Sequence, residues 1–365
     1  MARKRANLFG AALSVLHYTK TDRLVAPLTR GRGVIFMLHH VRPGDPGDFE
    51  PNRILRVTPE FLEEVIAHVK SEGFDCVSLD EAATRLKNQH GHRPFACFTL
   101  DDGYRDNRDF AYPIFKRLGV PFTIYVPSSF ADGEGDLWWL TLEAAIARAP
   151  KIILNMNGTE ETFATSTAVE KDMAFDKIYW WLRGLPECKA RDVVAELAKM
   201  NGYDPSQRCR ELVMSWDELR QLASDPLVTI GGHTVNHYAL AKLSDADASD
   251  EIRLGATRIE QELGQPCRHF SFPYGDERSA GPREFRLAKE IGLATAVTTQ
   301  KGLIQTQHAQ YLTALPRFSL NGDFQDIRFI KVMLSGLPFA LWNGMGWVQS
   351  RLKSFRSHGM AEDVR

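Results

Sequence analysis

Short apolar runs rich in β-branched residues alternate along this chain with segments of helical periodicity, and no other feature constrains the fold more. Parallel strands need such alternation, because the crossover from one strand to the next is usually a helix. The sequence therefore predicts an α/β fold built on a parallel sheet or barrel. The candidate strands are residues 34–38, 75–79, 95–100, 122–126, 227–230, 269–272 and 294–298, with an eighth at 315–320.

Two of the segments between these strands carry clear helix signals. Thr58 can cap a helix with Pro59 at its first position, and the apolar residues that follow recur at helical spacing. Residues 248–263 place a second apolar stripe on one face, and this segment stops at Gly264. Both segments are expected as helices that bury one face against the strands.

Charge and cysteine content narrow the function classes. The 45 Lys and Arg residues nearly balance the 46 Asp and Glu residues, and the net charge of -1 provides no general field for binding nucleic acid. The five cysteines are scattered and form no C-x-x-C pair, which argues against a disulfide framework and against a thiolate zinc site. A metal bound by this chain would therefore need histidine and carboxylate ligands.

Polar clusters follow three candidate strands directly, and strand ends are where functional groups converge in parallel α/β folds. The first cluster reads FTLDDGY and contains Asp101 and Asp102, whose side chains point in different directions. Taken alone, this pair fits a helix N-cap and a first-turn acid. The second cluster reads IGGHTVNH, and its His233 and His237 can reach one ion. Two histidines and one carboxylate would leave coordination positions open, as in a catalytic zinc site.

The third cluster reads FSFPYGD, and its Pro273 makes a rigid turn after the strand. Together, T-L-D-D-G, H-T-x-x-H and F-x-x-P-Y-G in this order resemble the motifs of the polysaccharide deacetylase family, carbohydrate esterase family four, which shares the nodulation protein B homology domain. The resemblance runs from about residue 33 to residue 321. It implies a distorted (β/α) barrel of seven or eight strands that performs metal-dependent N-deacetylation of sugars containing N-acetylglucosamine.

The resemblance also implies roles for individual residues. It makes Asp101 the general base and Asp102, His233 and His237 the metal ligands. The chemistry agrees, because a divalent ion can polarise the acetamide carbonyl while a free carboxylate takes a proton from the attacking water. Zinc is the expected metal, with cobalt, nickel and manganese as alternatives. The expected partner is an N-acetylated glycan, and no nucleic acid partner is expected.

Around these ligands, the resemblance places the backbone N–H of Tyr274, in the turn that Pro273 begins, at the oxyanion. Many family members carry an Arg two residues before that proline, where this chain has Ser271. The group that would orient the base is thus missing from its usual place. Arg317, on the last candidate strand, is the proposed substitute.

The histidine expected as the general acid also occupies a different position in this sequence than in most of the family. The usual C-terminal Leu-x-His motif has no match after residue 300, and His308 lacks the leucine two positions before it. A subset that resembles the poly-N-acetylglucosamine deacetylases carries this histidine on the first strand. Here the first strand ends Met-Leu-His-His, so His39 is assigned as the acid and His40 is the second choice.

Three segments, at 1–30, 131–214 and 326–365, do not follow the alternation of strands and helices. Residues 131–214, which we call the insertion, are far longer than an ordinary loop and are expected as a long helical insertion packed over one end of the barrel, with one strand-like run at 151–156. The predicted organisation is a helical extension at 1–30, a barrel at 31–325 interrupted by the insertion, and a C-terminal amphipathic extension at 326–365.

The two ends of the chain contain the segments that bear on membrane insertion or membrane-surface binding. No stretch reaches the roughly 18 uninterrupted apolar residues of a membrane-spanning helix. Residues 3–16, a basic triplet followed by a semi-apolar run, are interpreted as part of an amphipathic helix, with a cleaved signal peptide as the alternative. Residues 329–355 combine Trp and Lys/Arg with an apolar face, which fits a membrane-surface helix or a docking helix equally well. The expected location is cytoplasmic, with peripheral contact at the inner membrane if this stretch is a membrane-surface helix, and with secretion as the alternative.

Three alternatives stay open beside a polysaccharide or chitooligosaccharide deacetylase. The first is a deacetylase or deformylase of a lipid-linked sugar at the membrane face. The second is a non-catalytic carbohydrate-binding relative, although the presence of all four motif Asp and His residues argues against loss of activity. The third is a nucleotide-sugar transferase that uses Asp101 and Asp102 as a metal-diphosphate motif. It leaves both histidines unexplained, and the chain has no Gly-rich phosphate loop.

Overall fold

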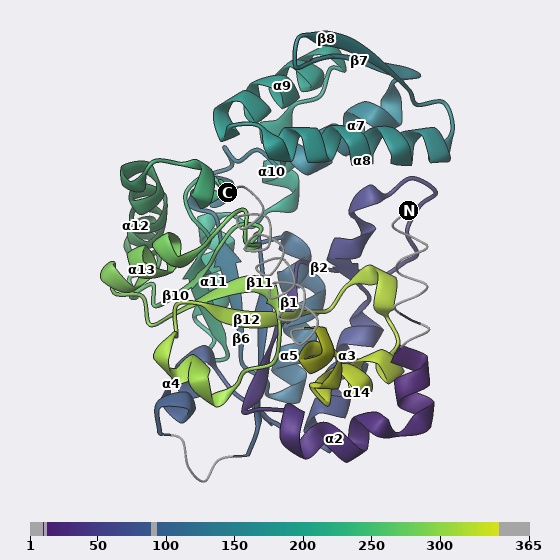
Figure 1. The fold of residues 1–365 in the computed structure, drawn as a ribbon. Coiled ribbons are helices and arrows are strands. Elements are labelled where there is room, and N and C mark those ends of the chain that lie inside the picture. The colour runs from purple at the N-terminus through teal and green to yellow at the C-terminus, as the bar shows by residue number, and fades with distance from the viewer. Residues whose placement is uncertain (1–9, 11–12, 89–92, 343–365) are drawn as a thin grey trace, which may run out of the picture.

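Hydrogen bonds between parallel strands close the centre of the molecule into a ring. Among residues 10, 13–88 and 93–342, which the computed structural model describes, seven strands pair in the order β1-β12-β11-β10-β9-β6-β5, and β5 pairs with β1. The eighth strand, β4, joins the outside of β5. This is the distorted (β/α) barrel that the sequence predicts (Figure 1). The strands are β1 (Gly33–Leu38), β4 (Asp75–Cys76), β5 (Phe95–Leu100), β6 (Phe122–Val126), β9 (Val228–Gly232), β10 (His269–Ser271), β11 (Thr295–Lys301) and β12 (Leu315–Ser319).

All eight candidate strands therefore exist; those at 95–100 and 122–126 match at both ends, and the other six differ by one to three residues at one or both ends. Every residue of β1, β5 and β6 is buried, because these strands face the barrel interior on one side and helices on the other. The strand predicted at 75–79 is wrong beyond Cys76. There the hydroxyl of Ser78 accepts a hydrogen bond from the N–H of Glu81 and a helix begins, so the chain leaves the sheet.

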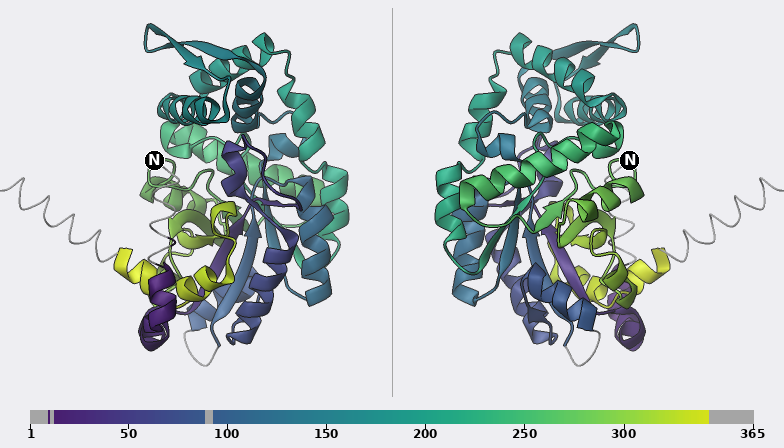
Figure 2. Two further views of the ribbon diagram at one scale, coloured as in Figure 1. Left: turned by 90° about the vertical axis from the view of Figure 1, so that its right-hand side faces the viewer. Right: turned by 90° about the vertical axis from the view of Figure 1, so that its left-hand side faces the viewer.

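Helices surround the barrel, as Figures 1 and 2 show. The hydroxyl of Thr58 caps α3, and the apolar face predicted for this helix is buried. The stop predicted at Gly264 is also confirmed, since this glycine adopts a left-handed conformation with φ of 66° directly after α12. The helices are α2 (Thr21–Thr29), α3 (Pro59–Ser71), α4 (Leu79–Asn88), α5 (Tyr112–Leu118), α11 (Trp216–Ala223), α12 (Asp245–Leu263), α13 (Pro282–Glu290) and α14 (Ile327–Leu334).

Short elements shape the loops at the strand ends. The two-residue strands β2 (His40–Val41) and β3 (Arg56–Val57) pair in parallel just beyond β1. The remaining turns are α6 (Ser128–Ala131), the 3-10 turns η1 (Pro51–Leu55), η3 (Leu240–Lys242), η4 (Thr306–Gln310) and η5 (Gly322–Phe324), and the π-helical turn η2 (Asn107–Ala111) that leads into α5.

The insertion forms a separate layer beyond one end of the barrel, at the top of Figures 1 and 2. Its elements are α7 (Trp138–Arg148), β7 (Lys151–Met156), β8 (Thr159–Ala164), α8 (Ala168–Gly184), α9 (Glu187–Met200) and α10 (Pro205–Leu212). Buried residues such as Leu142, Ile178 and Val194 belong to an apolar cluster distinct from the main barrel core.

The sequence predicted a helical insertion with one strand-like run. The structure instead contains two strands there, β7 and β8, which form an antiparallel hairpin. Asn157 and Gly158 join the two strands, both with positive φ. An Asn-Gly pair between alternating strands is the strongest short-range hairpin signal, because a tight hairpin turn needs left-handed backbone at both positions.

The predicted terminal features fall largely on residues that are not described. Of the N-terminal stretch, the basic triplet 3–5 and most of the semi-apolar run lie outside the described residues. The second half of the C-terminal stretch, from residue 343, lies outside them as well. No helix in the described ranges is long and apolar enough to cross a membrane.

Candidate active site

A pocket of about 280 Å³ opens at the carboxyl ends of the barrel strands. His39 from the end of β1, Asp101 and Asp102 from the end of β5, and His233 and His237 from the loop after β9 all line it. These residues span almost 200 positions of the chain. Barrel closure brings them together, because parallel strands deliver their carboxyl ends to one rim.

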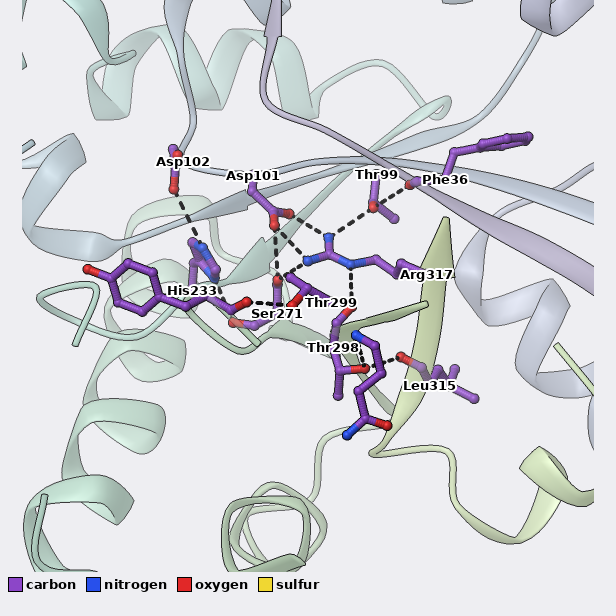
Figure 3. Close-up of polar contacts among 12 residues, drawn as sticks. Phe36, Thr99, Asp101, Asp102, His233, Ser271, Thr298, Thr299, Leu315 and Arg317 are labelled. Carbon is purple, nitrogen blue, oxygen red and sulfur yellow. Dashed lines mark hydrogen bonds and ion pairs between the residues drawn. The ribbon is translucent and has the colours of Figure 1, made fainter. Parts of the chain in front are cut away.

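Asp102, His233 and His237 form a buried cluster in this pocket. One ligand atom from each lies within 4.8 Å of the other two. The Nε2 atoms of His233 and His237 lie 3.5 and 3.4 Å from Oδ1 of Asp102. Nδ1 of His233 lies 2.6 Å from the carbonyl oxygen of Ser271, which only accepts hydrogen bonds. Nδ1 therefore carries a proton, and Nε2 is the nitrogen that faces Asp102 (Figure 3).

The chemistry of this cluster fits a divalent cation. Oδ1 of Asp102 and Nδ1 of His237 are buried and have no hydrogen-bond partner in the part of the chain that the structure describes. Burial would raise the pKa of Asp102, but the neighbouring histidines hold that pKa well below its usual range. An ionised carboxylate oxygen that faces imidazole nitrogens at this spacing offers the mixed oxygen and nitrogen ligand set that zinc and related metals use. Asp102, His233 and His237 could hold such an ion.

Backbone strain is concentrated around the pocket. In the described ranges, six residues other than glycine have positive φ, and four of them are Asp102, Thr234, His237 and Tyr274. A left-handed conformation costs such a residue about 1–3 kcal/mol, and it persists where the surroundings enforce it. The hydroxyl of Thr234 accepts a hydrogen bond from the N–H of His237 and helps to fix this loop.

The carboxylate of Asp101 faces the guanidinium of Arg317. Its two carboxylate oxygens accept hydrogen bonds of 2.7 Å from Nη1 and Nη2 of Arg317 (Figure 3). Nη2 of Arg317 and the hydroxyl of Ser271 also form a hydrogen bond of 3.0 Å. Arg317 thus reaches Asp101 from β12, and the Ser271 side chain is short enough to leave room for this contact.

The Arg317 contact controls the charge of Asp101. Burial would raise the pKa of this carboxyl, but the adjacent guanidinium holds the pKa below its usual range. Further hydrogen bonds fix the guanidinium itself, one to the carbonyl oxygen of Thr298 and one to the hydroxyl of Thr99. Asp101 is therefore an ionised, rigidly oriented carboxylate beside the histidine cluster.

The two histidines at the end of β1 have different surroundings. His39 lines the pocket, and burial lowers its pKa against the opposing charges of Asp102 and Asp101. His40 contacts Asp106 through Nδ1 at 2.6 Å and stacks on the ring of Tyr104 at 3.7 Å. Of the two candidates for the general acid, only His39 lines the pocket.

Tyr274 lies in the loop after β10 with φ of 59°, and its side chain lines the pocket. Its hydroxyl accepts a hydrogen bond of 2.7 Å from Nε1 of Trp138 in the insertion. Pro273 precedes it in the same turn but is not among the residues that line the pocket.

Several pocket residues were not predicted from the sequence. Trp139 belongs to α7, whereas Tyr179, Trp180 and Arg183 belong to α8, and all four line the pocket. Their spacing along α8 is ordinary for an amphipathic helix, so no motif distinguished them. The density of Trp residues in the insertion was the one available signal.

The closed parallel barrel and the buried Asp-His-His site define a barrel hydrolase that acts on carbon–nitrogen bonds other than peptide bonds. The chain belongs to the polysaccharide deacetylase family, whose model matches residues 88–296, more than half of the sequence. Members of this family act on N-acetylated polysaccharides. No curated protein sequence matches the chain.

Solved structures share the fold at low sequence identity. The deacetylase PplD of Streptococcus pyogenes, solved in complex with acetate, has a TM-score of 0.55 at 16% identity, over 82% of this chain and 97% of that chain. IcaB from Ammonifex degensii has a TM-score of 0.50 at 15% identity, over 83% and 97%. A de-N-acetylase from Aggregatibacter actinomycetemcomitans has a TM-score of 0.50 at 14% identity, over 82% and 98%.

Proposed function

We propose that this protein hydrolyses the acetamide of N-acetylglucosamine units in a polysaccharide or chitooligosaccharide. The observation that carries the proposal is the pair of adjacent carboxylates with separate partners. Asp102 faces His233 and His237, whereas Asp101 is held by Arg317. Hydrolysis of an amide needs both an electrophilic centre and a base, and these two carboxylates offer one position for each.

The proposed site would hold a divalent ion, with zinc as the expected metal, on Asp102, His233 and His237. Such an ion supplies Lewis acidity toward the acetamide oxygen and the attacking water. Asp101 stays ionised beside Arg317 and accepts the proton of the water as its oxygen bonds to the carbonyl carbon. The backbone N–H of Tyr274 is the proposed donor to the developing oxyanion.

The leaving amine needs a proton when the carbon–nitrogen bond breaks. His39 is the proposed donor, since it lines the pocket with Asp101 and Asp102. Because burial lowers the pKa of His39, its imidazolium form gives up its proton readily; once protonated, His39 delivers that proton to the sugar nitrogen, and acetate and the free amino sugar result. Arg317 acts through Asp101 and is a positioning residue in this scheme.

Acetate release tests the proposal directly. The purified protein is incubated with N-acetylglucosamine oligomers of one to five units, before and after treatment with a chelator and again after zinc is restored. We expect release that the chelator abolishes and zinc recovers. Absence of release from every oligomer would contradict the proposal.

A lipid-linked amino sugar is the second candidate substrate. An apolar cavity of about 410 Å³, lined by residues that include Phe318, Phe339 and Trp342, begins at the carboxyl end of β12. The N–H of Leu320 there donates to the carbonyl oxygen of Met37, a residue of the catalytic pocket. Preferred release of acetate or formate from a lipid-linked sugar in the same assay would favour this candidate.

A further inference from the structure

Two side chains of the insertion hold Tyr274, a residue of the barrel loop after β10. Nε1 of Trp138 in α7 donates a hydrogen bond of 2.7 Å to the tyrosine hydroxyl. The guanidinium of Arg183 in α8 lies 3.5 Å from the centre of the tyrosine ring. A cation at this distance is attracted by the aromatic ring. The insertion therefore contacts Tyr274 both at its hydroxyl and at its ring.

The two contacting side chains are themselves fixed by their surroundings. Trp138 is 3% exposed, and its ring stacks on that of Tyr179 in α8 with 5.1 Å between the ring centres. The side chain of Arg183 is 8% exposed, and its Nη2 donates a hydrogen bond of 2.9 Å to the hydroxyl of Ser279. Packing and hydrogen bonds thus restrict both side chains, so together they hold the ring of Tyr274 in one position.

The backbone of Tyr274 is strained and leaves its N–H available. Its φ of 59° lies in the left-handed region, which a residue other than glycine keeps only where its surroundings enforce it. Its carbonyl oxygen accepts a hydrogen bond of 2.6 Å from the hydroxyl of Thr299 in β11. Its N–H donates no hydrogen bond to a backbone or side-chain acceptor within the described residues. This N–H is free to donate to a ligand oxygen, as the proposed oxyanion role requires.

We propose that the insertion positions the oxyanion donor, because Trp138 and Arg183 hold the Tyr274 side chain and thereby fix the direction of its backbone N–H. This inference rests on the proposed function, in which that N–H donates to the oxyanion. A strained backbone relaxes when its restraint is removed, and a donor that has turned away no longer stabilises the developing charge. Trp138 is not among the residues that line the pocket, so it is a positioning residue that acts through Tyr274.

Substitutions at the Trp138–Tyr274 hydrogen bond test this proposal. Trp138→Phe removes the donor and Tyr274→Phe removes the acceptor, and both keep an aromatic ring and the backbone N–H. Each should lower kcat for acetate release about 10-fold, less than the roughly 10²- to 10³-fold loss that follows removal of a whole oxyanion donor. KM should change less than about 2-fold, because loss of an interaction made only in the transition state lowers kcat and leaves KM unchanged. The double variant should lose no more than either single variant, since both changes remove the same contact.

Trp181→Phe is the matched control. Nε1 of Trp181 in α8 donates a hydrogen bond of 3.3 Å to Oδ1 of Asn157 in the turn between β7 and β8, and Trp181 is not among the residues that line the pocket. The change removes the same kind of donor from the insertion without altering the contact to Tyr274. Its kcat should equal that of the wild type. An equal loss of kcat in Trp181→Phe and Trp138→Phe would indicate general loosening of the insertion and would overturn the proposal.

Acetate binding to the zinc-loaded protein, measured by calorimetry, separates this proposal from the proposed function because it needs no turnover. A carboxylate oxygen of acetate can accept a hydrogen bond from the same N–H, so Trp138→Phe should weaken acetate binding about 5-fold. Trp181→Phe should leave it unchanged. If the wild type releases no acetate from any sugar, this weaker binding in Trp138→Phe still supports the positioning role. Equal affinity in Trp138→Phe and the wild type overturns it, as does failure of the wild type to bind acetate. A fall in zinc affinity that matches the fall in kcat overturns it as well, since the substitution would then have disturbed the metal site.

Discussion

The barrel and the insertion both contribute residues to the catalytic pocket, but they differ in how far apart in the sequence their contacting elements lie. In the barrel, strands that are distant in sequence pair with one another, so that β1 hydrogen-bonds to both β5 and β12. In the insertion, α7 packs against α8 and α9, and β7 pairs with its immediate successor β8. The barrel supplies Asp101, Asp102, His233 and His237, whereas the insertion supplies aromatic and polar wall residues. We infer that chemistry and substrate contact are divided between the two regions.

Removal of the base should give the largest effect. Asp101→Asn should lower kcat for acetate release by about 10²- to 10⁴-fold, the usual contribution of a positioned general base, and should retain the metal. His233→Ala should lose both metal and turnover. Acetate assays combined with metal analysis of the zinc-loaded proteins check this pair. Retained turnover in Asp101→Asn would refute the base assignment, and unchanged zinc binding in His233→Ala would refute its role as a ligand.

The second largest effect is expected from substitution of Arg317. Arg317→Met leaves the Asp101 carboxylate buried without its partner, and breaking a buried ion pair in this way costs about 3–5 kcal/mol. The free energy of unfolding in urea measures the loss. The double variant Arg317→Met/Asp101→Asn should recover part of it, because the uncompensated charge is gone. No recovery would show that packing, rather than the ion pair, dominates this site.

A matched pair of core substitutions tests whether the two regions are independent. Ile178 in the insertion and Ile124 in β6 are both fully buried, and each change to Ala should cost about 2–5 kcal/mol. Ile178→Ala should loosen the insertion and spare zinc binding, whereas Ile124→Ala should weaken zinc binding as well. Limited proteolysis and zinc titration give the two readouts. Equal loss of zinc affinity in both variants would mean that the regions are coupled.

We expect the smallest effect from a substitution of Glu218, which lies in α11 directly after the insertion. Burial would raise the pKa of Glu218, but hydrogen bonds from Arg105 and from the N–H of Ser215 and the charge of Arg108 lower it to about 2. Because the folded pKa lies below the unfolded value of about 4.3, the stabilisation is present above that value and is lost as pH falls toward 2.

Glu218 is partly exposed, so Glu218→Gln should cost only about 1 kcal/mol at pH 7 and almost nothing near pH 2. Urea unfolding at a series of pH values measures the difference between wild type and variant. If the difference in unfolding free energy between wild type and variant does not shrink in acid, Glu218 stabilises the protein through packing rather than through its charge.

The sequence predicted most of the barrel and little of the insertion for a physical reason. Buried parallel strands are continuous apolar runs, and their polar ends carry recognisable chemistry, as at Asp101 and His233. The hairpin at Asn157 was missed although its Asn-Gly turn is a local signal. Trp180 and Arg183 could not be assigned, because their place in the pocket depends on how α8 lies over the barrel end.

By itself, the sequence determined the alternation of strands and helices, the cap at Thr58, the stop at Gly264 and the order of the three polar clusters. These features depend on backbone preferences and side-chain spacing within a few residues. Only the tertiary structure decided that Arg317 reaches Asp101, that His39 rather than His40 lines the pocket, and that α8 forms one of its walls. Those outcomes depend on barrel closure and on packing between segments far apart in the chain, which local spacing does not encode.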